Sequence, residues 1–164
     1  FFVATGSGFI INQLFIINIL KANMGGYMET AALSLGFLTF GAALGAIYSP
    51  KIKVKPVFAA VVISFVFSII LLSKFPIHFN YPIKLILIFI AVFPLAFFTG
   101  ILFPKGMAEV TDSKISLYLG IDTAASAAGF LFFYVIVTLF GFFQAALIAA
   151  VLYVVAAGIL IKLR

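Results

Sequence analysis

The chain has 164 residues, of which 66% are hydrophobic and 9% charged, and its formal net charge is +6. About a quarter of the residues in a typical soluble domain are charged, so this composition excludes a water-soluble globule and indicates an integral membrane protein. The basic residues stand singly or in short groups between apolar runs. They do not form a nucleic-acid-binding face, and no nucleic-acid partner is expected.

The residue types that the chain lacks exclude several kinds of chemistry. There is no cysteine, which removes disulfides, thiolate metal sites and thiol catalysis. The single histidine, His78, cannot form a two-histidine zinc motif. The sequence has no G-x-S-x-G or S-x-x-K motif and no pair of carboxylates within an apolar run. We therefore expect no metal, no cofactor and no enzymatic activity within these 164 residues. Enzymatic activity would need a further soluble domain.

Six apolar segments follow one another along the chain, and each is predicted to be a transmembrane helix. Their lengths suffice to cross a hydrocarbon core of about 30 Å at 1.5 Å per residue. The segments cover residues 1–20, 30–48, 57–74, 83–103, 117–140 and 143–161. We expect Pro104 to end the fourth helix, and Gly141 to separate the last two as a tight hairpin. The fold predicted for residues 1–164 is thus a single all-α domain of six transmembrane helices.

The basic residues are distributed unevenly between the two sides of this bundle. One side carries Lys51, Lys53, Lys55, Lys105, Lys114, Lys162 and Arg164, and the other carries Lys21, Lys74 and Lys84. By the positive-inside rule the richer side is cytoplasmic. We therefore expect a multi-pass protein of the cell membrane with both termini in the cytoplasm. Membrane lipid is an expected partner, with anionic headgroups near the lysines of residues 51–55.

Similar short patterns occur in the two halves of the chain. Thr5-Gly6 in the first segment matches Thr99-Gly100 in the fourth, and residues 39–45 of the second match residues 123–129 of the fifth. Segments that lie three apart have opposite orientations, so the pattern predicts an inverted 3+3 repeat resembling half of a major-facilitator transporter. The alternative is coincidence, because Gly, Ala and Thr are common in membrane helices.

Two of these segments carry small residues spaced four apart. Gly41 and Gly45 form a G-x-x-x-G pattern, and Ala125 and Gly129 form a similar one. Small residues on one helix face let two backbones approach closely in a membrane. The pattern predicts either helix packing within the chain or the contact face of a homodimer.

Polar side chains inside apolar segments are the candidate binding residues. Asn12, Gln13 and Asn18 lie in the first segment. An unpaired amide in an apolar medium costs about 2–7 kcal/mol, so Asn12 and Gln13 are expected to face the bundle interior. There they would either join helices by hydrogen bonds or contact a ligand.

Asp122 is the one acidic residue within an apolar run. A carboxylate inside the membrane indicates a functional site, and Tyr118 lies one helical turn before it on the same face, where it can hydrogen-bond. The structural alternatives are that Asp122 pairs with Lys105 or Lys114, or caps a break in the helix.

These patterns together resemble the membrane region of transmembrane spermidine/spermine synthase-like proteins. The family pattern runs approximately G-x-x-F-P, a short loop, and Y-x-x-[DN]-x-x-G-A-x-x-G, and the corresponding runs here are residues 98–104 and 118–129. Thr5-Gly6 followed by Gln13 is similar to the family's first helix. The chain departs from the pattern at Ala125, where the family prefers Gly, at Asn12, where it has Tyr, and by lacking a Pro before Gly141.

The resemblance implies a membrane module that binds or transports a small cationic, polyamine-like substrate. The soluble aminopropyltransferase domain that many family members carry is not part of these 164 residues. Under this reading, the candidate substrate-binding residues are Asp122, Gln13, Asn12, Tyr118 and Asn18. The alternative is a non-catalytic membrane anchor or assembly module with no ligand of its own.

Overall fold

The computed structural model describes residues 1–24, 26–73 and 80–163, and within these ranges the structure is helical with no strand. The long helices are α1 (Phe2–Met24), α2 (Tyr27–Tyr48), α3 (Val54–Ser73), α4 (Tyr81–Met107), α5 (Ile115–Phe140) and α6 (Phe142–Lys162). Two 3-10 turns, η1 (Ser49–Lys51) and η2 (Asp112–Lys114), lie in the α2–α3 and α4–α5 connections. All six long helices have the length and apolar character needed to cross a membrane, which confirms the six predicted segments.

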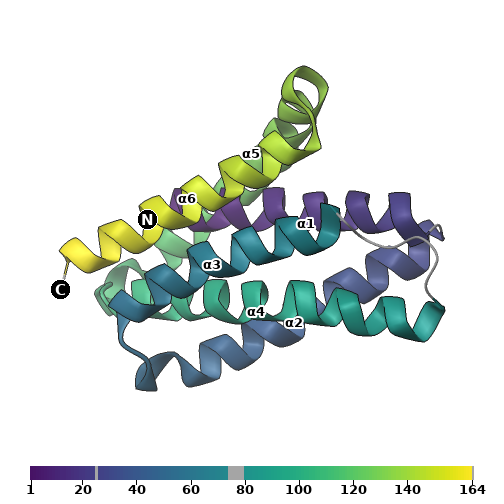
Figure 1. The fold of residues 1–164 in the computed structure, drawn as a ribbon. Helices are drawn as coiled ribbons and strands as arrows, with labels where there is room; N and C mark the ends of the chain where they lie inside the picture. Colours follow the sequence, from purple (N-terminus) through teal and green to yellow (C-terminus); the bar gives the residue numbers. More distant parts are fainter. Residues whose placement is uncertain (25, 74–79, 164) are drawn as a thin grey trace.

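Helix α1 lies at the centre of the bundle and is the most buried of the six (Figure 1). It packs against α5 and α6 on one side and more lightly against α2 on the other, while α2 packs extensively against α4. Helix α3 covers α4 and α6. Both termini lie at the same end of the bundle. Two close helix crossings therefore organise the fold, α1 with α5 and α2 with α4.

The prediction that Pro104 ends the fourth helix is wrong, because α4 continues to Met107. A proline within a helix removes one backbone hydrogen bond, but the turn that follows is still closed here. The N–H of Ala108 donates to the carbonyl oxygen of Pro104 at 2.9 Å. Burial of Lys105 and Gly106 also supports this turn, so packing overrides the local rule.

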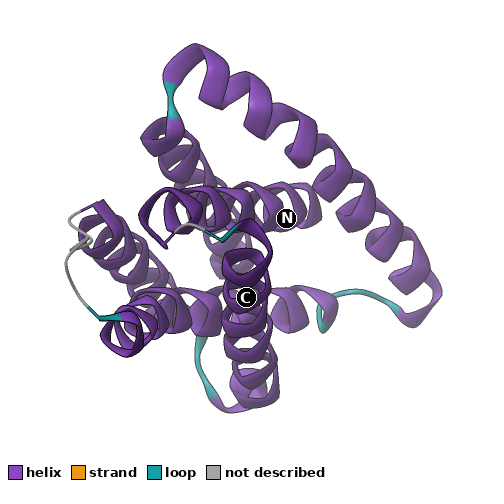
Figure 2. Ribbon diagram, turned by 90° about the vertical axis from the view of Figure 1, so that its right-hand side faces the viewer, coloured by secondary structure: helices purple, strands orange, loops and turns teal. Residues whose placement is uncertain are grey.

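The break between the last two helices falls at Gly141, as predicted. Gly141 has a φ of 95°, a conformation that favours glycine, and its N–H closes the end of α5 on the Val137 carbonyl at 3.0 Å. The two helices then diverge rather than pack as a tight hairpin, and both contact α1 far more than each other (Figure 2). The expected turn is present, but the expected hairpin packing is not.

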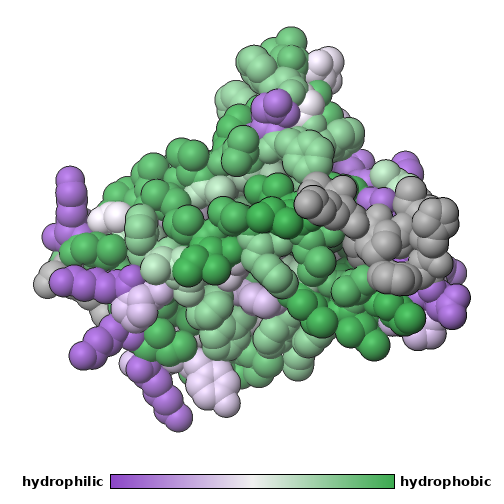
Figure 3. Space-filling model, viewed as in Figure 1, coloured by the Kyte–Doolittle hydropathy of each residue, from purple (hydrophilic) through white to green (hydrophobic). Residues whose placement is uncertain are grey.

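The outer surface matches a membrane environment. Large apolar side chains are exposed along all six helices, and α5 is the least buried of them. In the space-filling view, hydrophobic surface covers the middle of the molecule, and hydrophilic side chains gather toward its two ends (Figure 3). An apolar belt between polar ends is the surface that a bilayer covers.

Candidate functional site

The α1–α5 crossing brings polar groups together between two closely spaced backbones. A Cβ atom added to Gly6 would overlap the backbone oxygen of Asp122 and lie 3.0 Å from Ser126 Oγ, so only glycine permits this approach. Beside it, the hydroxyl of Thr5 donates a hydrogen bond to Asp122 Oδ1 at 3.1 Å. About one turn further along α5, the carbonyl oxygen of Ala125 accepts a hydrogen bond from Ser7 Oγ at 2.9 Å.

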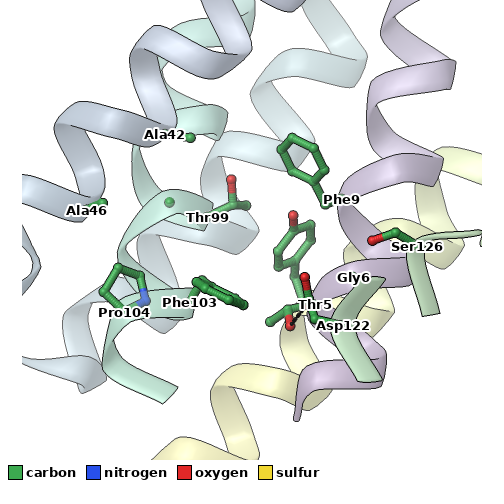
Figure 4. Close-up of a pocket in the computed structure, with 12 residues that line it drawn as sticks. Thr5, Gly6, Phe9, Ala42, Ala46, Thr99, Phe103, Pro104, Asp122 and Ser126 are labelled. Carbon is green, nitrogen blue, oxygen red and sulfur yellow. Dashed lines mark hydrogen bonds between the residues drawn. The ribbon is translucent and has the colours of Figure 1, made fainter. Parts of the chain in front are cut away.

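A cavity of about 280 Å³ opens beside this crossing (Figure 4). Its lining residues come from five helices and are Thr5, Gly6, Phe9, Ala42, Ala46, Thr99, Gly100, Phe103, Pro104, Asp122, Ser126 and Tyr153. Phe9 and Phe103 supply aromatic wall, and Ala42 and Ala46 form an apolar side opposite Asp122. The cavity thus combines one carboxylate and several hydroxyl groups with a mainly apolar wall, as ligand sites commonly do.

Two further hydroxyl groups lie on the inner side of the cavity. Thr99 is buried on α4, and its hydroxyl group donates a hydrogen bond to the Leu95 carbonyl oxygen of the same helix at 2.8 Å. Tyr153 of α6 is 3% exposed and lies close to the Thr99 side chain at the edge of the cavity. These contacts connect α4 and α6 to the polar crossing of α1 and α5.

Asp122 is half-buried and lies seven residues into α5, about 10 Å along the helix from its start. That end of α5 follows η2 and the loop of Glu109 and Asp112. The carboxylate is therefore within the apolar span but close to one polar end of the bundle. A group at this depth can be reached from water through a cavity without crossing the whole membrane.

The other predicted binding residues lie away from this cavity. The ring of Tyr118 packs against the ring of Phe2, with centroids 4.9 Å apart. The hydroxyl group that donates a hydrogen bond to Asp122 is that of Thr5. Asn12 is buried and Gln13 half-buried on α1, but neither lines the cavity. Asn18 donates from Nδ2 to the Leu14 carbonyl of its own helix at 2.8 Å.

The small-residue patterns lie at contacts between helices of this chain. A Cβ atom on Gly41 would lie 2.7 Å from Ala96 Cβ, and one on Gly45 would overlap the carbonyl oxygen of Phe97, both on α4. Gly129 approaches Ser7 of α1 in the same way, and Ala125 is buried beside it. Of the two interpretations, the structure gives these residues a packing role within the chain.

Sequence reasoning missed Thr5, Ser126, Thr99 and Tyr153 as site residues. Thr5 and Thr99 had been noted only as parts of the repeated Thr-Gly pattern. Tyr153 carried a signal that could have been used, because it is the only polar residue between Gln144 and Lys162. Within the described part of the chain, no three His, Cys, Asp or Glu side chains come together to hold a metal ion.

The fold and this site define a multi-pass membrane protein with a mainly apolar cavity that holds one carboxylate beside a close helix crossing. No protein-family model, no curated protein and no solved structure matches the chain. The resemblance to spermidine/spermine synthase-like membrane proteins therefore rests on the sequence motifs alone, and the function that it implies stays a prediction.

Proposed function

We propose that this chain is a membrane module that binds and moves a small cationic solute, with Asp122 as its counter-ion. The observation that carries the proposal is the half-buried carboxylate of Asp122 within an apolar helix. It accepts a hydrogen bond from Thr5 and lines a cavity. Intramembrane acids are costly and characteristically mark substrate or ion pathways. An organic cation that enters the cavity would compensate the charge of this carboxylate.

The motif resemblance agrees with this assignment at the level of chemistry. Transmembrane spermidine/spermine synthase-like proteins are associated with amines, and the matching motifs in residues 98–104 and 118–129 contribute six of the cavity-lining residues. These are Thr99, Gly100, Phe103, Pro104 and Asp122 together with its neighbour Ser126 on the next turn. We further propose that the end bearing both termini faces the cytoplasm of the cell membrane, as the charge distribution predicts.

We also propose that the bundle is an inverted repeat of α1–α3 and α4–α6, comparable to half of a major-facilitator transporter. Equivalent residues supporting the repeat have equivalent contacts. A Cβ on Gly6 would lie 3.0 Å from Ser126 Oγ of α5, and one on Gly100 would lie 2.5 Å from Ala42 Cα of α2. In the sequence match, Gly6 corresponds to Gly100 and Ser126 to Ala42.

A second set of equivalent contacts supports the same repeat. A Cβ on Gly45 would lie 3.2 Å from the Ile101 nitrogen, and one on Gly129 would lie 2.9 Å from Ser7 Cα. Gly45 corresponds to Gly129, and Ile101 to Ser7. Helix pairing agrees as well, since α1–α5 corresponds to α4–α2 and α1–α6 to α4–α3.

The proposed repeat explains why the cavity lies where it does. Thr5, Gly6 and Phe9 of one half correspond to Thr99, Gly100 and Phe103 of the other, and all six line the cavity. Substrate sites of repeat-built transporters lie at the interface between the repeats, where relative movement of the two halves changes access. Transport, beyond static binding, is therefore part of the proposal.

The test is ligand-dependent stabilisation of the purified protein against heat. A ligand that binds only the folded state adds about 2.7 kcal/mol of stability when its concentration is one hundred times its Kd. Among a panel of primary amines, from monoamines to spermidine, at least one should stabilise the wild type, and Asp122→Asn should abolish the effect. Asp112→Asn, a change of the same kind at an exposed acid of η2, is the matched control and should leave stabilisation intact.

Two outcomes would contradict the proposal. Equal stabilisation of the wild type and Asp122→Asn would remove Asp122 from the site. Absence of stabilisation by every amine would favour the alternative function, a membrane anchor or assembly module without a ligand. Flux of the stabilising amine into liposomes then separates transport from binding.

A further inference from the structure

We propose that the ligand of this cavity is a monoamine, one positive charge on a short apolar body, rather than a polyamine. This inference rests on the proposed function and narrows its substrate class. It is drawn from the charge count, the wall chemistry and the size of the cavity.

The charge count allows one ammonium group. Among the described residues that line the cavity, Asp122 is the only charged one. The chain has four acidic residues in all, and the other three, Glu29, Glu109 and Asp112, lie at the start of α2 and in the α4–α5 connection. A second ammonium group in the cavity would lose its hydration without gaining a carboxylate partner, which disfavours a diamine or a longer polyamine.

The remaining wall suits an apolar body rather than a second charge. Away from Asp122, the lining is mainly apolar and comes from Ala42, Ala46, Gly100, Pro104 and the rings of Phe9 and Phe103 (Figure 4). Its polar groups there are the uncharged hydroxyl groups of Thr99 and Tyr153. Aromatic faces attract a nearby cation, so these rings also favour the ammonium end where it approaches Asp122. Alkyl carbons that contact the alanine side are removed from water, which adds to the affinity of a monoamine.

The size of the cavity limits the ligand to a small molecule. Its volume of about 280 Å³ lies just below the range for small-molecule sites, about 300–1,000 Å³. The hydroxyl groups of Thr5, on α1, and Ser126, on α5, lie beside Asp122 and can accept further N–H groups of a single ammonium. One ammonium group thus uses all the polar groups at this end of the cavity.

The decisive experiment compares pentylamine with 1,5-diaminopentane by calorimetric titration of the whole chain in lipid nanodiscs, with empty nanodiscs as the blank. The two probes have the same chain length and differ in one ammonium group. We expect pentylamine to bind at least tenfold more tightly than the diamine, and 1-pentanol, which lacks charge, to bind at least tenfold more weakly than pentylamine.

The possible failures are distinguishable. A diamine that binds as tightly as pentylamine, or more tightly, overturns the monoamine inference and leaves the proposed function standing. A pentanol affinity equal to that of pentylamine overturns both, because charge would play no part. Failure of both amines to bind also overturns both.

A gain-of-function variant tests the same inference from the opposite direction. Ala46 lies across the cavity from Asp122, so Ala46→Asp supplies a second carboxylate for the distant ammonium of the diamine. We expect the affinity for 1,5-diaminopentane relative to pentylamine to rise at least tenfold. Ala46→Asn, of similar size and without charge, is the control and should leave the ratio unchanged. An unchanged ratio in a folded Ala46→Asp variant would contradict the inference.

Discussion

The two close helix crossings of this bundle achieve the same backbone approach with different chemistry. At the α2–α4 crossing, Gly41, Gly45 and Gly100 meet alanine and backbone atoms, and the contact is apolar. At the α1–α5 crossing, Gly6 and Gly129 provide an equally close approach, but the neighbouring side chains are hydroxyl and carboxylate groups. Small residues thus build the bundle at both crossings, whereas side-chain hydrogen bonds between the two helices are described at the α1–α5 crossing.

The physical basis of the difference is the cost of polarity in lipid. Helices associate in a membrane through close van der Waals packing, for which the apolar crossing is sufficient. The carboxylate of Asp122 adds a burial cost, which its bond to Thr5 offsets only in part. We therefore expect the α2–α4 crossing to dominate stability, and the α1–α5 crossing to combine stability with binding.

The largest expected effect is at the apolar crossing. Gly45→Ile places side-chain atoms where the carbonyl oxygen of Phe97 already lies, so α2 and α4 must separate. Overpacking of this kind should reduce the free energy of unfolding by about 3 kcal/mol, measured by reversible unfolding in mixed detergent.

The matched control for this change is Gly36→Ile on the same helix. A Cβ there has no atom within 4 Å, so the stability should change by about 0.5 kcal/mol at most. Equal effects at positions 36 and 45 would mean that the α2–α4 approach does not hold the bundle together.

A smaller loss of stability is expected at the polar crossing, together with a loss of binding. Gly6→Ala should move α5 away from α1, because the added Cβ overlaps the Asp122 backbone oxygen. We expect about 2 kcal/mol of destabilisation and weaker amine binding in the same titration. Gly158→Ala on α6, where a Cβ meets open space, should lower neither the stability nor the amine affinity. Unchanged amine affinity in Gly6→Ala would separate the crossing from the site.

The smallest effect concerns a single hydrogen bond between α1 and α5. Ser7→Ala removes the 2.9 Å bond to the Ala125 carbonyl and should cost about 0.6 kcal/mol, the average found for interhelical bonds in a membrane protein. Thr138→Val removes a bond within α5 alone, to Tyr134, and is the comparison. A larger loss for Thr138→Val than for Ser7→Ala would argue against a stabilising role for the interhelical contact.

Much of the fold could be predicted from sequence because hydropathy and helix length are local properties. The six helices and the break at Gly141 follow from them directly. The predicted end of α4 was wrong because the rule for Pro104 considers local sequence only. Burial of Lys105 and Gly106 depends on neighbouring helices. Divergence of α5 from α6 likewise depends on how each packs on α1.

The candidate site could be predicted only in part. Asp122 was identified because an acid within an apolar run is visible in the sequence. Its partner Thr5 is 117 residues away, and helical spacing pointed instead to Tyr118, whose ring contacts Phe2. The glycine patterns also left two interpretations open, since spacing fixes the helix face and not the helix that covers it.

The single-residue joint at Gly141 has a consequence for how the protein adapts to its bilayer. With one residue between α5 and α6, the ends of the two helices must stay at the same membrane depth. The exposed rings of Phe140, Phe142 and Phe143 flank this joint. In a thinner or thicker bilayer, neither helix can shift along the membrane normal independently, so the pair must adapt through its tilt.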